Sequence, residues 1–159
     1  MRGPYGRRDR LIQEKNHDVY QEQNKWPEPT LCPQCGALLT GGRWTWTNPL
    51  EPVNEAICPA CRRIADHYPA GYVEIGGPFY VAHQQEILNL VRNVEQQEKE
   101  AHPLERIMSI TDNSDGTLIL TTGLHLARRL GEALSRAYQG EFSMQYADGE
   151  QRIRVQWQR

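Results

Sequence analysis

The spacing of four cysteines constrains this chain more than any other feature of its sequence. Cys32 and Cys35 form one Cys-x2-Cys pair, and Cys58 and Cys61 form a second pair after a gap of 22 residues. Each pair can supply two corners of a tetrahedron, and the intervening loop can fold back to bring the four sulfurs together. The spacing therefore predicts one structural zinc ion bound by all four cysteines.

Three other uses of these cysteines fit the sequence less well. Two disulfides require an oxidising compartment, which no other feature of the chain indicates. A thioredoxin-type redox pair uses one Cys-x-x-Cys motif in a βαβ setting, whereas this chain has two motifs and no such setting. A catalytic zinc needs an open coordination position, and four thiolates leave none.

The residues beside the ligands indicate the local fold. Both pairs begin Cys-Pro, and Gly36 can adopt a positive φ after the first pair, which is typical of a tight knuckle. After the second pair, Arg62 and Arg63 open a stretch that reads as a helix start, and their charge would offset that of the thiolates. Knuckle, hairpin and helix in this order predict a treble-clef finger, with a zinc ribbon as the alternative.

The chain divides into four predicted parts with an α+β fold overall. Residues 1–28 are expected to be a flexible basic arm, and residues 29–78 a four-cysteine zinc-binding module that contains a hairpin strand at 43–47, a helix at 58–68 and a strand at 72–75. Residues 79–102 predict one long connecting helix, whose acidic second half is expected to project into solvent.

Residues 103–159 show the clearest periodicity. An alternating stretch at 106–112, the turn at 113–116 and the return at 117–122 predict one hairpin. A helix with Leu126, Leu130 and Leu134 on one stripe follows, and a second hairpin turns at Asp148-Gly149. The prediction is a ββαββ domain whose single helix covers one apolar face of the sheet.

Bulk composition limits the function classes only loosely. The formal net charge is −2, hydrophobic residues make up 38%, and the mean hydropathy is −0.72. This suggests a modest core that relies partly on a metal, and it gives no global case for nucleic-acid binding. We find neither an apolar membrane span nor an apolar signal-peptide core, and we therefore expect a soluble, intracellular, cytoplasmic protein.

Local cationic and aromatic spots nevertheless favour RNA as a partner. On the zinc module and on the C-terminal helix, the residues that we expect to contact RNA are Arg43, Trp44, Arg62, Arg63, Arg128, Arg129 and Arg136. Each has a plainer interpretation, because an amphipathic helix normally carries charge on its outer face and a tryptophan near a zinc cage is normally core. The basic N-terminal arm is a third such spot.

No nucleophile elbow, phosphate-cradling loop or paired His-Glu helix motif occurs, so we expect no enzymatic activity. The leading hypothesis is a non-enzymatic, zinc-stabilised protein that binds the ribosome or another structured RNA. One alternative is a protein–protein adaptor that uses the acidic helix and the C-terminal sheet. Another is a redox or zinc-sensing switch that uses the cysteines themselves.

The motifs Cys32-Pro33-Gln34-Cys35-Gly36-Ala37 and Cys58-Pro59-Ala60-Cys61-Arg62-Arg63, together with the segments at 102–108 and 125–134, resemble an uncharacterised family of small bacterial zinc proteins with four cysteine ligands. The resemblance covers roughly residues 16–159. It implies an association with low-oxygen or stress gene clusters, and hence a stress-related factor.

The first knuckle and its downstream Gly42-Arg43-Trp44 also resemble, more distantly, a cysteine-rich finger of the adaptor that escorts the large ribosomal subunit from the nucleus. That adaptor carries more zinc-binding pairs than this chain, so one finger at most corresponds. The resemblance implies contact with the ribosome or ribosomal RNA, with Arg43 and Trp44 as candidate contacts.

Overall fold

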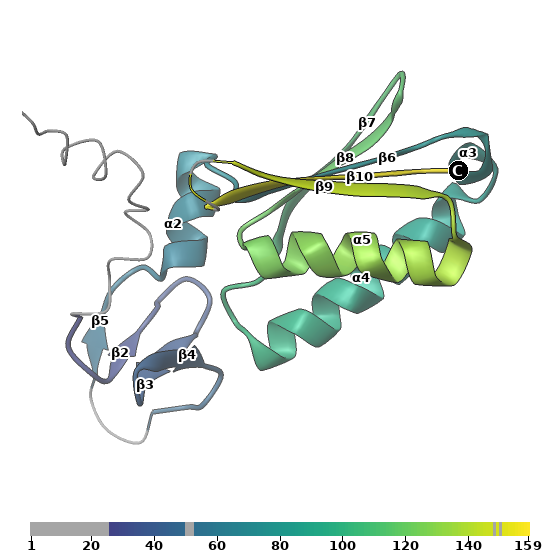
Figure 1. Cartoon of the computed structure of the whole chain (residues 1–159). Helices are drawn as coiled ribbons and strands as arrows, with labels where there is room; N and C mark the ends of the chain where they lie inside the picture. Colours follow the sequence, from purple (N-terminus) through teal and green to yellow (C-terminus); the bar gives the residue numbers. More distant parts are fainter. Residues whose placement is uncertain (1–25, 50–52, 148, 150) are drawn as a thin grey trace, which may run out of the picture.

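The computed structural model describes residues 26–49, 53–147, 149 and 151–159. Most of the predicted arm at 1–28 and Asp148 of the last turn therefore lie outside the described residues. The described part is an α+β fold with two mixed sheets and four helices (Figure 1). Along the chain its elements are β2 (Thr30–Leu31), β3 (Leu38–Thr40), β4 (Arg43–Thr45), β5 (Asn54–Glu55), α2 (Pro59–Asp66), β6 (Gly71–Gly76), α3 (Pro78–Ala82), α4 (Gln84–Ala101), β7 (Ile107–Asn113), β8 (Gly116–Thr121), α5 (Leu124–Tyr138), β9 (Glu141–Ala147) and β10 (Arg152–Gln158).

The smaller sheet belongs to the cysteine-bearing module and has the order β4-β3-β2-β5. Strand β2 pairs antiparallel with β3 and parallel with β5, so the two segments that precede the cysteine pairs lie side by side. Strands β3 and β4 form a hairpin through Gly41 and Gly42, whose φ angles of 63° and 81° are both positive. Such turns match the right-handed twist of the paired strands, and glycine adopts them without a steric penalty.

The larger sheet has five strands in the order β7-β8-β6-β10-β9. The two predicted hairpins and the helix between them occur in the expected chain order, but the expected ββαββ sheet is not what forms. Strand β6, which the sequence placed at the end of the zinc module, lies between the hairpins. It runs antiparallel to β8 and parallel to β10, with Val73 opposite both Ile119 and Val155.

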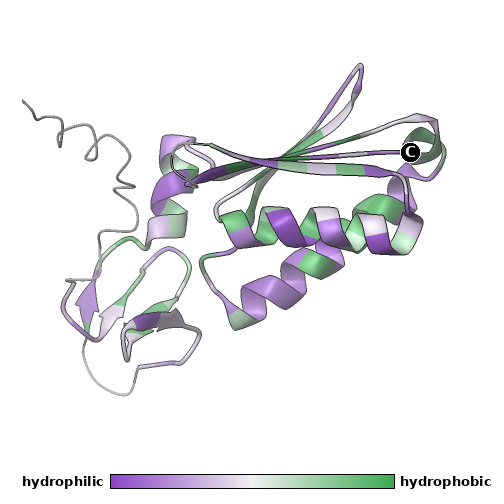
Figure 2. Cartoon of the chain, in the orientation of Figure 1, coloured by the Kyte–Doolittle hydropathy of each residue, from purple (hydrophilic) through white to green (hydrophobic). Residues whose placement is uncertain are grey.

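The main core lies between this sheet and the helices α4 and α5, which cover the same face (Figure 1). The predicted stripe Leu126, Leu130 and Leu134 of α5 is fully buried against the sheet. Figure 2 shows the apolar colour along the central strands and on α5, while the outer surface of α4 is largely polar. Two helices therefore cover this face of the sheet, where the sequence predicted a single one.

The predicted single helix at 79–102 is two helices, α3 and α4, with a break at His83. The second half of α4 does not project freely into solvent. Val94 and Glu98 are both buried. The Glu98 carboxylate forms an ion pair with Arg129 of α5, with 2.9 Å between Oε2 of Glu98 and Nη1 of Arg129. The helix thereby packs along α5 and brings its carboxyl end towards the cysteine-bearing module.

Candidate metal centre

The four predicted ligands meet at one point. Their sulfur atoms all lie within 4.8 Å of one another, and none of the four cysteines forms a disulfide. The Sγ atoms of Cys35 and Cys58 are 3.8 Å apart. A tetrahedral ion with Zn–S bonds of about 2.3 Å requires S···S edges of about 3.8 Å, so this separation fits one zinc-sized ion.

Local backbone geometry holds the first pair. Cys32 and Cys35 lie between β2 and β3, where the amide of Cys32 donates to the Ala37 carbonyl and the Gly36 amide donates to the Cys32 carbonyl. Gly36 has a φ of 86°, as its place in the knuckle predicts. The Ala37 amide then donates to the Cys35 sulfur at 3.4 Å. The knuckle therefore supplies both sulfurs and an amide that stabilises a thiolate.

A helix start holds the second pair, as the sequence predicted. Cys58 is the N-cap residue of α2, with Pro59 in the first turn, and the Cys61 amide donates to the Cys58 sulfur at 3.3 Å. The Cys58 amide in turn donates to the Cys32 sulfur at 3.3 Å. The amino end of the helix therefore directs partial positive charge at the thiolates.

A residue that sequence reasoning missed completes the site. Arg106 immediately precedes β7, yet it is only 8% exposed and its guanidinium contacts three of the four cysteines. Its Nη1 donates to Cys61 Sγ at 3.3 Å, and its Nη2 donates to Cys35 and Cys58 Sγ at 3.2 Å each. Its Nε donates to the Pro103 carbonyl at 2.8 Å, which fixes the plane of the group.

The same contacts set the protonation of the thiols. A hydrogen bond from Cys58, an amide and the charge of Arg106 lower the pKa of Cys35 to about 4. The hydrogen bond with Cys35, together with burial, raises the pKa of Cys58, and burial raises that of Cys61. Burial acts to lower the pKa of Arg106, but its bonds to the thiolates outweigh this effect and raise that pKa. Before a metal binds, these contacts thus favour a thiolate at Cys35 beside an arginine that stays charged.

Arg106 takes the role that the sequence assigned to Arg62 and Arg63. Arg62 is exposed on the surface of α2, whereas Arg63 is buried and donates to the Tyr68 carbonyl at 3.2 Å. Among the described contacts, neither guanidinium donates to a cysteine sulfur. Because four thiolates around Zn²⁺ carry a formal charge of −2, one guanidinium against the sulfurs halves the net charge of the centre.

The other residues predicted to contact RNA lie on β4 and α5. Trp44 is half-buried and packs against the cysteine cluster, as its plainer interpretation predicted. On α5, Arg129 pairs with Glu98, and Arg128 contacts His125 and lies 3.9 Å from Glu132. Exposed guanidiniums remain on three separate elements, at Arg43, Arg62 and Arg136.

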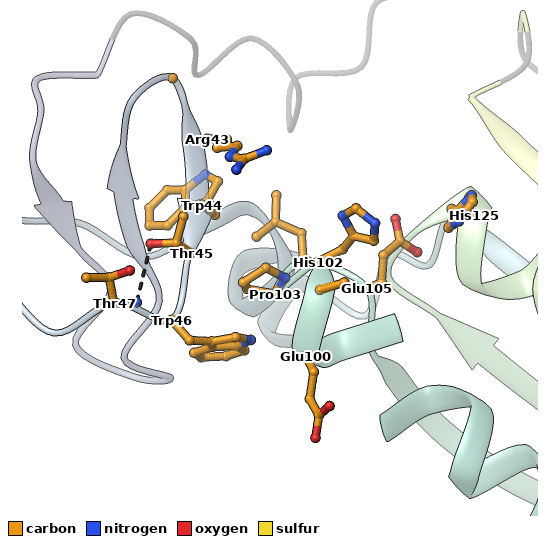
Figure 3. Close-up of a pocket in the computed structure, with 13 residues that line it drawn as sticks. Arg43, Trp44, Thr45, Trp46, Thr47, Glu100, His102, Pro103, Glu105 and His125 are labelled. Atoms are coloured by element: carbon orange, nitrogen blue, oxygen red, sulfur yellow. Dashed lines mark hydrogen bonds between the residues drawn. The ribbon is translucent and has the colours of Figure 1, made fainter. Parts of the chain in front are cut away.

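A cavity of about 720 Å³ lies between the cysteine-bearing module and the junction of α4 with β7 (Figure 3). One wall is the continuous segment Gly42–Thr47 of the β3–β4 hairpin. The opposite wall is formed by Glu100–Glu105, with His125 of α5 beside it. The indole nitrogen of Trp46 donates to the Lys99 carbonyl at 2.7 Å and bridges the two walls at one side.

A scan against protein-family models finds no match to this chain, and a search of curated proteins finds no significant one. The resemblances drawn from the cysteine motifs therefore stay predictions. In the part of the chain that the structure describes, no helix has both the length and the apolar character needed to cross a membrane.

Proposed function

We propose that this protein is a non-enzymatic binding scaffold of the treble-clef class, organised by one structural zinc ion. The observation that carries the proposal is the cage of four cysteine sulfurs with the buried guanidinium of Arg106 against it. Four thiolates satisfy the tetrahedral preference of zinc and leave no position for a water nucleophile. The ion would stabilise the module, as zinc does in small domains with little core of their own.

Through Arg106, the ion would also link the zinc module to the rest of the fold. Arg106 immediately precedes β7 of the five-stranded sheet, while its guanidinium donates to cysteines of the zinc module. Outer contacts of this kind orient ligands and tune their charge. The zinc centre would therefore fasten the cysteine-bearing module to the larger sheet and fix the geometry of the cavity between them.

For the partner, the sequence favoured the ribosome or structured RNA, with a protein–protein adaptor as the alternative. Phosphate binding depends on several cations that act together along one surface. Arg129 and Arg128 face carboxylates, and Arg63 is buried. The exposed arginines of the predicted set lie on three different elements, β4, α2 and α5. This distribution supports an adaptor function, whose interface we place on the acidic helix α4 and the zinc module rather than on that helix and the C-terminal sheet.

The test combines metal analysis with affinity capture. We expect one zinc per chain by elemental mass spectrometry, lost in a variant with all four cysteines changed to serine. The tagged wild-type protein should retain the same protein partner with and without RNase, at low and moderate salt. Recovery that is abolished by RNase and falls steeply with salt would instead establish RNA as the partner. Absence of zinc would refute the scaffold.

A further inference from the structure

Strand β4 forms one edge of the small sheet, with β3 on its inner side. Two residues link β3 to β4, so Thr40 and Arg43 form a hydrogen-bonded pair and Leu39 and Trp44 form the next, non-hydrogen-bonded pair. The backbone N–H and C=O of Trp44 therefore point away from β3. Among the described residues neither group has a partner. An edge of this kind is a template for another strand.

The free edge opens into the 720 Å³ cavity. Six consecutive residues, Gly42–Thr47, line that cavity. Side chains alternate between the two faces of a strand, so one face alone could contribute only every second residue. All three residues of β4, Arg43–Thr45, belong to this lining, which means that the backbone edge of the strand itself borders the space. These three extended residues span about 10 Å, which is long enough to pair with a short peptide strand.

The walls of the cavity carry fixed aromatic and apolar side chains that could contact such a segment. Trp46 is 36% exposed, yet its indole is held by the hydrogen bond to the Lys99 carbonyl. Trp44 is fixed from behind by the cysteine cluster and by an edge-on contact with Trp26 at 5.7 Å. Pro103 and Leu104 form the apolar part of the opposite wall. Rigid indoles lose little conformational entropy on binding and are typical anchors of protein interfaces.

Charge distinguishes the two ends of the cavity. Arg43 lies at one end and Glu100 at the other (Figure 3). Both side chains are exposed, and the described contact of the Glu100 carboxylate is with the neutral amide of Gln96 at 3.1 Å. An extended segment with an acidic residue at the first end and a basic residue at the second would satisfy both.

We propose that the free edge of β4 and the cavity beside it bind an extended peptide segment of a partner protein as an added strand. Backbone bonds to Trp44 would hold the segment, and an apolar side chain would enter between Trp46 and Leu104. Arg43 and Glu100 would set its direction. This inference rests on the adaptor function proposed above and names the kind of partner that it takes.

The test uses the zinc-loaded full chain and a phage-displayed library of random dodecapeptides. We expect enrichment of peptides with an acidic residue, an apolar residue and a basic residue at alternating positions. When the library is selected on the Arg43→Glu variant, the enriched peptides should carry a basic residue where the wild-type protein selects an acidic one. Selection on Arg136→Glu, which lies on the exposed last turn of α5, should give the same preference as wild type. An enriched peptide N-methylated on its bonding edge should bind at least about tenfold more weakly, a loss of about 1.4 kcal/mol.

Two further measurements locate the binding. Amide hydrogen exchange at Trp44 should slow in the complex, and Trp46→Ala with wild-type zinc content should weaken binding. The proposal is overturned if no peptide is enriched, if Arg43→Glu selects the same peptides, or if N-methylation has no effect. Displacement of the peptide by a single-stranded oligonucleotide would assign the site to RNA instead. If zinc is stoichiometric and an RNase-resistant protein partner is captured, any of these failures removes the strand site alone and leaves the scaffold function standing.

Discussion

Replacing Arg106 by methionine tests whether the guanidinium is part of the metal centre. Methionine keeps much of the side-chain volume but removes three donors to sulfur and one to the Pro103 carbonyl. At 3.2 Å, one pair of unit charges interacts by about 5 kcal/mol at an effective dielectric constant of about 20. The cost of burying the guanidinium offsets part of this, and removing one partner of a buried pair typically costs about 3–5 kcal/mol. We expect a loss of that size.

The assay is denaturant unfolding of the zinc-loaded protein, together with the rate of zinc transfer to a chromogenic chelator. Arg106→Met should unfold at markedly lower denaturant concentration and release zinc faster. Arg106→Lys keeps the charge without the planar fork of donors, so it should fall between Arg106→Met and wild type. Arg62→Met, on the exposed surface of α2, serves as the matched control. If Arg106→Met unfolds within about 0.5 kcal/mol of wild type and keeps its zinc equally well, the guanidinium does not stabilise the centre.

Three further outcomes follow from the same contacts. Chelation of zinc, or Cys32→Ser, should increase amide exchange in β3 and leave the core around Val155 protected, because the large sheet has its own core. Gly131→Ala should destabilise the fold by about 1–3 kcal/mol, because the added methyl group would lie 2.5 Å from Phe142 and 2.6 Å from Val155. This loss should appear even though alanine favours the helical conformation over glycine by about 1 kcal/mol. Burial raises the pKa of Glu105, so the folded state binds its proton more tightly than the unfolded chain does, and stability should fall as pH rises from about 4.5 through the raised value. Glu105→Gln should remove that dependence.

Each of these outcomes has a direct check. Exchange that rises equally in both sheets after chelation would show one cooperative unit rather than two. Gly131→Ala with wild-type stability in denaturant would mean that Phe142 moves aside freely. Stability curves for Glu105→Gln and wild type that run parallel from pH 4 to pH 7 would remove Glu105 as the source of the pH dependence.

The cluster of four cysteines could be predicted from the sequence because the information is local. Two residues separate the members of each pair, and Gly36 and Pro59 fix the backbone beside them, so the knuckle and the helix start follow from neighbouring residues. The hairpin strand β4 follows likewise from the alternation of polar and apolar residues at 43–47. These predictions needed no knowledge of what packs against the module.

The large sheet shows where such reasoning stops. The sequence predicted β6 as a strand, but it did not predict that β6 would pair with β8 and β10. Antiparallel hairpins are joined by short turns and can be inferred along the chain, whereas the parallel pairing of β6 with β10 joins segments about eighty residues apart. The same applies to α4, where Glu98 looks like an ordinary solvent-facing residue until Arg129 is placed against it.

The sequence by itself thus determined the grouping of the four cysteines, the helix stripe at Leu126, Leu130 and Leu134, and the two hairpins, because spacing and periodicity encode them within a few residues. Only the tertiary structure decided that Arg106, which is 45 residues beyond Cys61, closes the thiolate cage. A buried cation finds its partner through the fold and not through a motif, since any of the chain's arginines carries the same charge. That placement joins the cysteine-bearing module to the sheet and leaves the edge of β4 open beside the cavity.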